Sequence, residues 1–390
     1  MALMTSRERV VATLAHQEPD RVPMDLGSTN VTGINSTAYR NLCTYLNSEC
    51  HEEILLDPLS RVADVDESVR RRLAVDCVGI HTNPSSYSPT KEWREGSATY
   101  RVDEFGTVRV MPDDGFWFDP VGFPLAGMKL NDLSNYPWPN PYDANRVDGK
   151  ANEARWLFTH TDYAIVAMPP TLILTRAQQM RGFAELLMDL IDDPKFASAV
   201  LDKITEFNAI VGERFLKEVG AYVQVVMAAD DLGTQSAMMI SPDLYRKMIK
   251  PRQAEWIKAL KRGSNAKVFF HSDGDVYPII PDLIEIGVDI LNPVQGSAAQ
   301  MDPARLKREF GNDLCFWGGV DTQTILPRGT SKDVETEVRL RLEQLGQGGG
   351  YVLAPVHNIM NEVPPENVLA LYDTGREYGK YPMHFVSGHI

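Results

Sequence analysis

Two segments of the chain end in side chains that can bind a metal ion or transfer a proton. In 267–274 the run KVFF is followed by His271 and Asp273, and in 350–358 the run GYVLAPV is followed by His357. The β-branched and aromatic residues of each run predict a short buried strand, with the polar side chains at its end. An α/β barrel carries its catalytic residues at such strand ends, so the pattern indicates an enzyme.

The spacing of these side chains predicts a metal site. His271 and Asp273 are two residues apart, so in extended backbone both side chains leave the same face. His357 follows the last expected strand, and strand ends converge in a barrel. Two histidines and a carboxylate form an open catalytic site for zinc or another divalent metal. In the metal-free alternative, Asp273 caps a turn and the histidines act as hydrogen-bond donors or acid/base groups.

A second polar cluster, Asp230 and Asp231, follows the expected strand 222–228. Adjacent carboxylates at a barrel mouth can supply a catalytic acid, a further metal ligand or a contact to a cationic substrate nitrogen. Alternatively, one of them caps the next helix. Other polar residues near expected strand ends are candidate substrate contacts: Arg176, Gln235, Asn292, Gln295 and Asp321.

Short apolar runs alternate with helical patterns along most of the chain. Strands are expected at 22–26, 164–168, 222–228, 268–271, 289–294, 314–320 and 351–354. Helices are expected at 178–191 and 243–261, and after Asp302 and Ser331, where capping residues precede apolar periodicity. This alternation predicts a parallel sheet and, with about eight units, a single (β/α)₈ TIM barrel over 1–390. No glycine-rich or Walker motif favours an open nucleotide-binding sheet.

One segment, about 84–142, departs from this alternation. Residues 98–110 predict a β-hairpin that turns at 103–106, and an aromatic run at 116–118 and a proline-rich stretch follow. We interpret the segment as an insertion near the barrel mouth. It either covers the surface or forms a lid or wall for the substrate.

Composition limits the classes of partner. The 390-residue chain has 43% hydrophobic residues, a formal net charge of −14 and no apolar run long enough to span a membrane. The acidic balance argues against nucleic acid or an anionic membrane surface as a partner. The first residues do not form a signal peptide, so we expect a cytoplasmic protein. The four cysteines have no metal-site spacing, and we expect reduced, mostly buried thiols (Cys43, Cys50, Cys77 and Cys315).

Several motifs together resemble the uroporphyrinogen decarboxylase superfamily. They are RERV at 7–10 with HQEPDRVP at 16–23, LNPVQ at 291–295, FWGGVD at 316–321 and the closing stretch 350–368. The resemblance covers nearly the whole chain. It implies a single (β/α)₈ barrel with its active site at the carboxyl ends of the strands.

The resemblance includes a departure from the decarboxylases of the superfamily. Those enzymes carry an arginine-rich segment after the first strand, whereas MDLGSTN at 24–30 has no arginine. A porphyrinogen with many carboxylates would be poorly held without those charges, so uroporphyrinogen itself is not the expected substrate. The histidine of the family's Gly-His-Gly motif matches His357.

The chain is closest in type to the cobalamin-dependent methyltransferases of the superfamily, whose zinc is held by a His-x-Cys pair and a distant cysteine. His271 falls on that histidine, Asp273 on the first cysteine, and His357 near the second. The resemblance thus implies a more Lewis-acidic metal with oxygen and nitrogen ligands. We expect a metal-dependent methyltransferase that moves a methyl group between a small methylated substrate or a corrinoid protein and an acceptor such as a corrinoid protein, tetrahydrofolate or a thiol.

Two other functions are compatible with the same residues. One is a metal-free lyase or decarboxylase acting on a small carboxylate, with His357 and either Asp230 or Asp231 as acid/base groups. The other is a non-enzymatic corrinoid-binding or scaffold protein. Polar residues at so many strand ends favour the enzymes.

Overall fold

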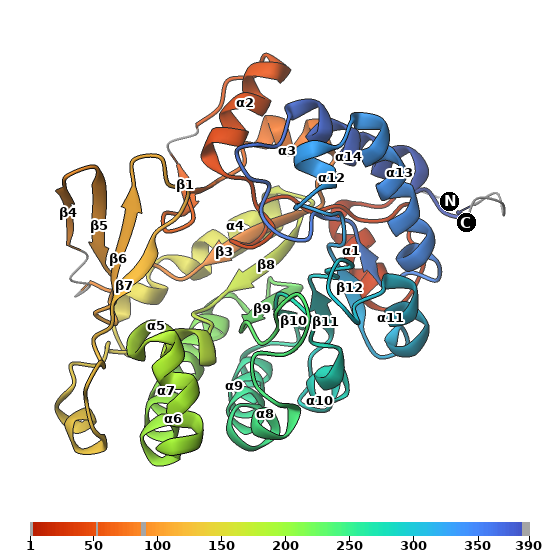
Figure 1. The fold of residues 1–390 in the computed structure, drawn as a ribbon. Coiled ribbons are helices and arrows are strands. Elements are labelled where there is room, and N and C mark those ends of the chain that lie inside the picture. Colours follow the sequence, from red (N-terminus) through yellow and green to blue (C-terminus); the bar gives the residue numbers. More distant parts are fainter. Residues whose placement is uncertain (1–2, 52–53, 87–90, 384–390) are drawn as a thin grey trace.

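A curled sheet of seven parallel strands forms the centre of the molecule, in the order β13-β12-β11-β10-β9-β8-β3 (Figure 1). The computed structural model describes residues 3–51, 54–86 and 91–383, so 87–90 of the expected insertion lie outside the described part. The strands are β3 (Cys77–His81), β8 (Ala164–Met168), β9 (Val225–Ala229), β10 (Lys267–His271), β11 (Ile290–Asn292), β12 (Cys315–Trp317) and β13 (Tyr351–Val352). Six of them fall within or overlap the expected runs, and β3 was not expected.

The expected first strand, 22–26, is not a regular strand, and a closed eight-stranded barrel is therefore not confirmed. Met24 forms only an isolated parallel bridge with Leu353, next to β13. On the other side, its carbonyl accepts from the Asp76 backbone N–H, 2.8 Å away. Pro23 has no N–H to donate, and the Met24 N–H binds the Asp76 carboxylate at 2.8 Å instead of a neighbouring strand. The segment thus contacts both edges of the sheet without completing a ladder.

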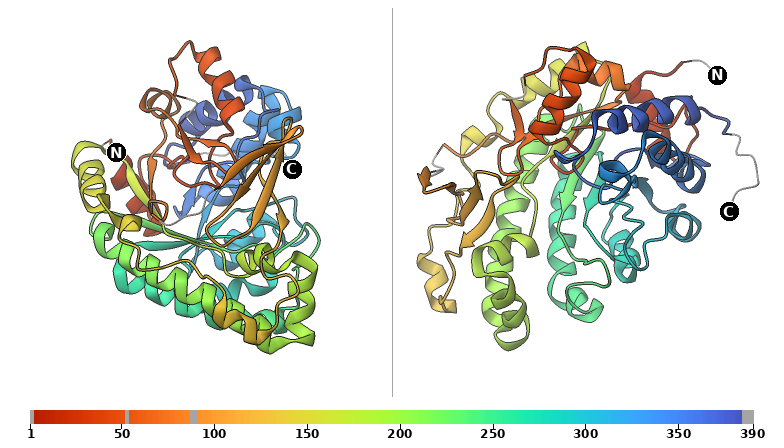
Figure 2. Two further views of the ribbon diagram at one scale, coloured as in Figure 1. Left: turned by 90° about the vertical axis from the view of Figure 1, so that its left-hand side faces the viewer. Right: turned by 45° about the horizontal axis from the view of Figure 1, so that its top comes forward.

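Helices lie outside the sheet, as Figures 1 and 2 show for the long pair α7 and α9. Their bounds are α1 (Ser6–Leu14), α2 (Ser36–Leu46), α3 (Glu67–Leu73), α4 (Lys150–His160), α5 (Leu174–Arg181), α6 (Phe183–Asp192), α7 (Pro194–Val219), α8 (Pro242–Met248), α9 (Lys250–Gly263), α10 (Ile280–Glu285), α11 (Pro303–Phe310), α12 (Ile325–Arg328), α13 (Ser331–Arg341) and α14 (Pro365–Tyr378). Shorter helical turns lie at Leu130–Asn135, Ala144–Val147, Tyr277–Ile279 and Leu342–Gly346.

Two expected helices are each divided. The pattern at 178–191 forms α5 and α6, which meet at Gly182 with a φ of 106°. The pattern at 243–261 forms α8 and α9, and Pro251 occupies the first turn of α9. Proline cannot donate to the preceding turn, so it begins a new helix there.

The sheet is apolar on both faces. One buried cluster lies along one face and includes Val166, Val225, Phe269 and Trp317. Alternate residues such as Ile165 and Val268 belong to a larger cluster that the helices share. Because both faces are covered, the strands read as continuous apolar runs rather than as alternating patterns.

The insertion contains a separate antiparallel sheet in the order β4-β5-β6-β7. Its strands are β4 (Glu92–Glu95), β5 (Ala98–Val102), β6 (Val108–Pro112) and β7 (Asp119–Gly122). The expected hairpin is the pair β5 and β6, and Asp103 closes its turn by accepting from the N–H groups of Phe105 and Thr107 at 3.0 Å. A small two-stranded sheet, β1 (Leu55–Asp57) and β2 (Val62–Ala63), precedes it.

The cysteines only partly follow the expectation of reduced thiols. Cys77 and Cys315 are free and buried, but Cys43 and Cys50 form a disulfide with their Cα atoms 6.2 Å apart. Cys43 lies on α2, and the chain leaves this helix through Asn47 in the left-handed region, which brings Cys50 back to it. Among the described helices, none is long and apolar enough to cross a membrane.

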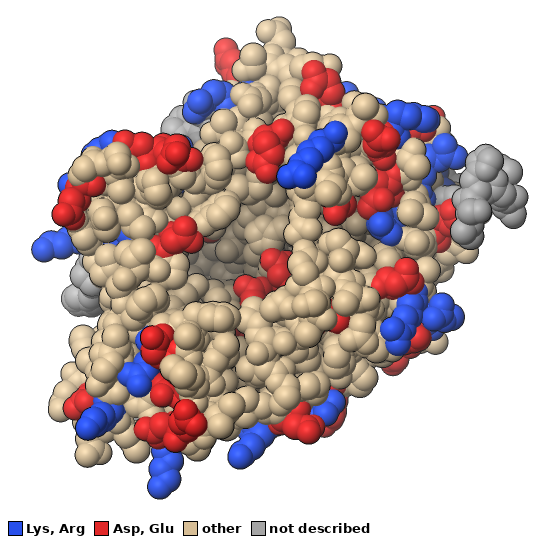
Figure 3. Space-filling model, in the orientation of Figure 1, with Lys and Arg blue, Asp and Glu red and all other residues tan. Residues whose placement is uncertain are grey.

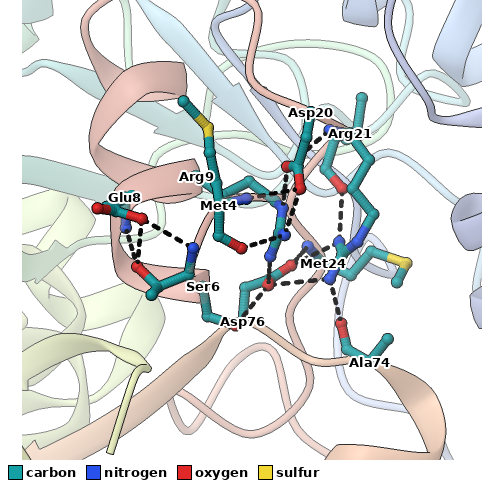
Figure 4. A network of polar contacts seen from close by, with 11 residues as sticks. Met4, Ser6, Glu8, Arg9, Asp20, Arg21, Met24, Ala74 and Asp76 are labelled. Atoms are coloured by element: carbon teal, nitrogen blue, oxygen red, sulfur yellow. Dashed lines mark hydrogen bonds and ion pairs between the residues drawn. The ribbon is translucent and has the colours of Figure 1, made fainter. Parts of the chain in front are cut away.

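A buried ion-pair network surrounds Asp76 immediately before β3 (Figure 4). The fully buried carboxylate lies 2.6 Å from Arg9 of α1 and 2.7 Å from Arg21, and it also accepts from Ser6 at 2.8 Å. Arg9 in turn pairs with Asp20 at 2.6 Å. The network therefore fastens α1 and the segment before Met24 to the edge of the sheet.

Removing the Asp76 carboxylate should destabilise the fold strongly. In Asp76→Ala, Arg21 loses its one ion pair to a described residue and Arg9 loses one of two. We therefore expect a loss of about 3–5 kcal/mol in the free energy of unfolding, measured by urea denaturation. The control is Asp113→Ala, because Asp113 pairs with Arg94 on the exposed insertion sheet. That variant should lose less than about 1 kcal/mol. Equal losses in the two variants would show that the buried network does not hold this edge.

Candidate metal centre and active site

The carboxyl ends of β9, β10 and β13 gather acidic and histidine side chains. His271 ends β10, Asp231 follows β9, and His357 follows β13. One possible ligand atom each of His271, Asp273 and His357 lies within 4.8 Å of the others. The three residues expected as metal ligands are thus brought together, although the two histidines lie 86 positions apart in the sequence. In the same orientation as Figure 1, a hollow with acidic side chains on its border is visible (Figure 3).

Asp231 joins this group. The Nε2 atom of His271 lies 3.8 Å from Asp273 Oδ1 and 3.9 Å from Asp231 Oδ1. The two histidine rings meet edge to face, with centroids 5.4 Å apart. Two carboxylates and two imidazoles therefore surround one small volume.

Asn292 fixes the orientation and the tautomer of His271. Parallel register places Asn292 beside His271 on β11, and its Oδ1 lies 2.6 Å from the His271 Nδ1. The Asn292 Nδ2 donates to the Trp317 carbonyl at 3.0 Å. Because a carbonyl oxygen can only accept, the amide nitrogen must face Trp317 and the amide oxygen must face His271. Nδ1 of the neutral ring therefore carries the proton, and the Nε2 lone pair faces Asp231 and Asp273.

Asp273 presents an oxygen that nothing in the described part of the chain satisfies. Its Oδ1 is buried and has no hydrogen-bond partner, whereas the Asp273 backbone N–H donates to Asp231 Oδ1 at 3.2 Å. A buried carboxylate oxygen without a partner is costly. A divalent cation would satisfy this oxygen, the second carboxylate and the bare His271 nitrogen together, so the donor set fits a metal.

Gly274 and Gln295 hold the loop that carries Asp273. Gly274 has a φ of 82°, and a Cβ atom there would approach the backbone of Gly233 and Thr234 to 2.5–2.6 Å. Its N–H donates to the Gln295 side chain at 2.7 Å. Gln295, expected as a substrate contact, thus supports the loop that carries Asp273.

His357 is held by its neighbour Asn358. The Asn358 Oδ1 accepts from the Gly33 N–H at 2.7 Å, and its Nδ2 donates to the Asn30 carbonyl at 2.9 Å. Burial lowers the pKa of His357, so its ring is neutral near pH 7 and can bind a metal. Sequence reasoning missed Asn358, although its position directly after His357 was the available signal.

Asp230 faces away from this group. It is fully buried and accepts from the N–H groups of Leu174 and Thr175 at 2.8 and 2.9 Å and from the Gln253 side chain at 3.2 Å. Burial raises the pKa of Asp230 to about 6. Asp230 therefore satisfies the first N–H groups of α5, a helix that precedes it in the chain, and not those of the next helix as the capping alternative expected. Asp231 alone of the pair lies at the site, and its N–H donates to the Thr175 hydroxyl at 3.1 Å, a contact that was not expected.

The other expected substrate contacts lie in three different settings. Asn292 is buried with both ends of its amide engaged by the protein. Asp321 caps the start of α12 by accepting from Thr324 and Ile325, and Gln235 is exposed and donates to Gln323 at 3.0 Å. Arg176 pairs with Asp103 of the insertion and lines a separate cavity.

Comparisons with known proteins agree with this architecture. Residues 165–378, more than half of the chain and all of the gathered side chains, match the model of the family described as Uroporphyrinogen decarboxylase (URO-D). A methylated-thiol-coenzyme M methyltransferase of Methanosarcina mazei is 23% identical over 65% of this chain and 65% of its own length. A uroporphyrinogen decarboxylase of Syntrophotalea carbinolica is 25% identical over 50% of this chain and 52% of its own length.

A solved structure resembles the whole fold. A methyltransferase from Methanosarcina mazei aligns with 96% of this chain and 99% of its own, with a TM-score of 0.67 and 17% sequence identity. At that identity the likeness concerns the fold alone. The family match begins at the second residue of β8, includes β9 to β13 and ends at the last residue of α14. The chain therefore belongs to the uroporphyrinogen decarboxylase family.

Proposed function

We propose that the protein is a metal-dependent methyltransferase acting on a small methylated substrate, with a divalent metal, zinc as first choice, held by His271, Asp273 and His357. The observation that carries the proposal is the His271 Nε2 atom 3.8 Å from Asp273 Oδ1, a buried oxygen that accepts no hydrogen bond from any described residue. The methyltransferase among the similar proteins supports the reaction class.

We further propose that 22–26 acts as the eighth strand of the barrel, since it bonds to both sheet edges.

The residues of this chain divide the work at the site. When bound, a metal supplies a Lewis acid that polarises the heteroatom of the donor or acceptor. Asn292 keeps the His271 Nδ1 protonated and the Nε2 free, and Gln295 and Gly274 hold Asp273 in place. Asp231, whose side chain is 36% exposed, can accept a proton from the substrate at the mouth. A corrinoid protein is the proposed methyl partner.

A decarboxylase acting on a small carboxylate is the second candidate, favoured by the match to curated uroporphyrinogen decarboxylases. In that reaction Asp231 and His357 would serve as acid/base groups. Uroporphyrinogen itself fits poorly, because the segment 24–30 provides no arginine and its Asp25 is fully buried, bonded to Ser28 and Trp317.

Removal of a proposed ligand should remove the metal. Protein purified without chelator should contain about one zinc or related divalent ion per chain, measured by plasma mass spectrometry, and His271→Ala should lower its affinity at least about 100-fold. The control is His160→Ala, because His160 is exposed on α4 and stacks on Trp156.

His271→Ala and His160→Ala should both keep the thermal unfolding midpoint of the parent protein, since the large apolar core does not depend on this ion. Metal content and methyl transfer unchanged in both His271→Ala and His357→Ala would contradict the proposed site. Loss of activity in those variants, with no metal in the parent protein, would favour the decarboxylase.

The tautomer of His271 can be measured without metal. In ¹⁵N-histidine-labelled, metal-stripped protein at a pH about two units above the ordinary histidine pKa, long-range ¹H–¹⁵N spectra should show His271 protonated at Nδ1. His271→Gln identifies the signal among the eight histidines. The preference should weaken in Asn292→Leu, which removes the acceptor. A proton on Nε2 in the parent protein would contradict the role of Asn292.

The absence of arginine from 24–30 should prevent the use of uroporphyrinogen. The protein should consume no more uroporphyrinogen III than buffer alone does. Consumption is measured by chromatography of the oxidised porphyrins. The uroporphyrinogen decarboxylase of Syntrophotalea carbinolica serves as the positive control. Turnover at about 1 per second or faster would restore decarboxylation of that substrate.

A further inference from the structure

A second cavity lies between the insertion and the carboxyl edge of the sheet, with a volume of about 550 Å³. Met168 at the end of β8 and Met227 of β9 form part of its wall. The insertion contributes Phe105 and Phe118, which are nearly fully buried. The cavity therefore opens at the same edge of the sheet that carries the histidine and aspartate group, beside strands β8 and β9.

Two arginines on this wall share a single carboxylate. Asp103 Oδ2 lies 2.8 Å from Nη1 of Arg176 on α5 and 3.4 Å from Nη2 of Arg109 on β6. Arg109 also donates to the Gln179 side chain at 2.7 Å and lies 3.5 Å from the Phe118 carbonyl. One carboxylate thus faces two guanidinium groups in a largely buried setting, so the two arginines share a single ion-pair partner among the described residues.

Arg109 also has a hydrogen-bond donor that no described residue accepts from. The residue is 5% exposed, and its Nε has no hydrogen-bond partner in the part of the chain that the structure describes. Burial, and next the repulsion of Arg176, lower the pKa of Arg109. A buried guanidinium in this state favours an added anion, because charge-assisted hydrogen bonds are strong where water is excluded.

Three other acidic residues line the cavity, and none of them forms an ion pair with Arg109 or Arg176. Glu104 pairs with Arg146 at 2.5 Å. Asp57 accepts from the Leu59 N–H at 2.9 Å, and the exposed Asp119 accepts from the Trp117 indole at 3.0 Å. Neither Asp57 nor Asp119 forms an ion pair with a described residue, although Asp57 attracts Arg109 at longer range.

We propose that Arg109 and Arg176 bind the carboxylate of a small organic anion, whose carbon skeleton packs against Phe105 and Phe118. The insertion is then part of a substrate wall and contributes a specificity residue. The inference rests on the proposed function only where it identifies this anion as the enzyme's substrate. Binding itself requires neither metal nor turnover.

Substitution of Asp103 tests whether anion binding becomes stronger when the competing carboxylate is removed. Its Oδ1 closes the hairpin turn, and an asparagine could still accept there from Phe105 and Thr107. Its Oδ2 competes with an incoming carboxylate for the two arginines. Asp103→Asn should therefore strengthen anion binding, whereas the neutral variants Arg176→Gln and Arg109→Gln should weaken it.

Calorimetric titration of the full chain with phenylacetate and its neutral amide, phenylacetamide, tests the proposal. The acid should bind at least about tenfold more tightly than the amide, as expected for hydrogen bonds to a charged group. Arg176→Gln should abolish this preference and Asp103→Asn should increase it. The control is Arg94→Gln, because Arg94 lies on the same sheet but pairs with Asp113 on its exposed side.

Three outcomes would overturn the proposal: no preference for the acid, a preference kept in both Arg176→Gln and Arg109→Gln, or weaker acid binding in Asp103→Asn. Arg176 is the more exposed of the two arginines, so its variant remains informative if Arg109→Gln does not fold. His271→Ala should still bind phenylacetate. If His271→Ala alone loses the preference, the anion binds at the metal centre, and this inference fails while the proposed function stands.

Discussion

Parallel pairing of the seven strands is the constraint on which the rest of the structure depends. Because all carboxyl ends emerge at one edge, side chains far apart in sequence meet there. The register between β10 and β11 places Asn292 beside His271, and the turn after β10 returns Asp273 to the same point. Asp76 and its arginines hold the remaining edge through Met24. The site is therefore a product of sheet geometry more than of any local motif.

Supporting residues give the site its chemical character. Asn292 selects the tautomer of His271, Gln295 fixes the loop of Asp273, and Asn358 fixes that of His357. Each of these residues acts through its side-chain amide. Asn292 and Asn358 also donate from the amide nitrogen to a backbone carbonyl, and Gln295 is buried. Such supporting contacts set both the direction and the basicity of the potential ligands. The same edge also carries the arginine-lined cavity, which places the proposed anion site beside the proposed metal ligands.

Sequence patterns could predict those parts of the fold that depend on local composition. The buried runs of β8 and β10 and the hairpin of β5 and β6 are as expected, because apolar continuity and turn residues determine them locally. The segment 22–26 looked like a strand, but Pro23 and the Asp76 carboxylate interrupt its ladder. The nearness of His271, Asp273 and His357 followed from the barrel expectation, and their role as ligands stays a prediction. The outward turn of Asp230 and the Arg109–Gln179 contact depend on long-range packing that no local pattern reports. The Cys43–Cys50 bond depends instead on the left-handed turn at Asn47, which the cysteine spacing alone did not indicate.

Anomalous diffraction at the zinc absorption edge, from crystals of the protein supplied with zinc, tests the metal site most directly. We expect one strong peak per chain bonded to His271 Nε2, an Asp273 oxygen and a His357 nitrogen, at distances of about 2.0–2.2 Å, with at least one position left for water or substrate. Asn292 should remain bonded to the His271 Nδ1 in that structure. No peak at these residues, or a peak bonded to other side chains, would contradict the proposed metal site.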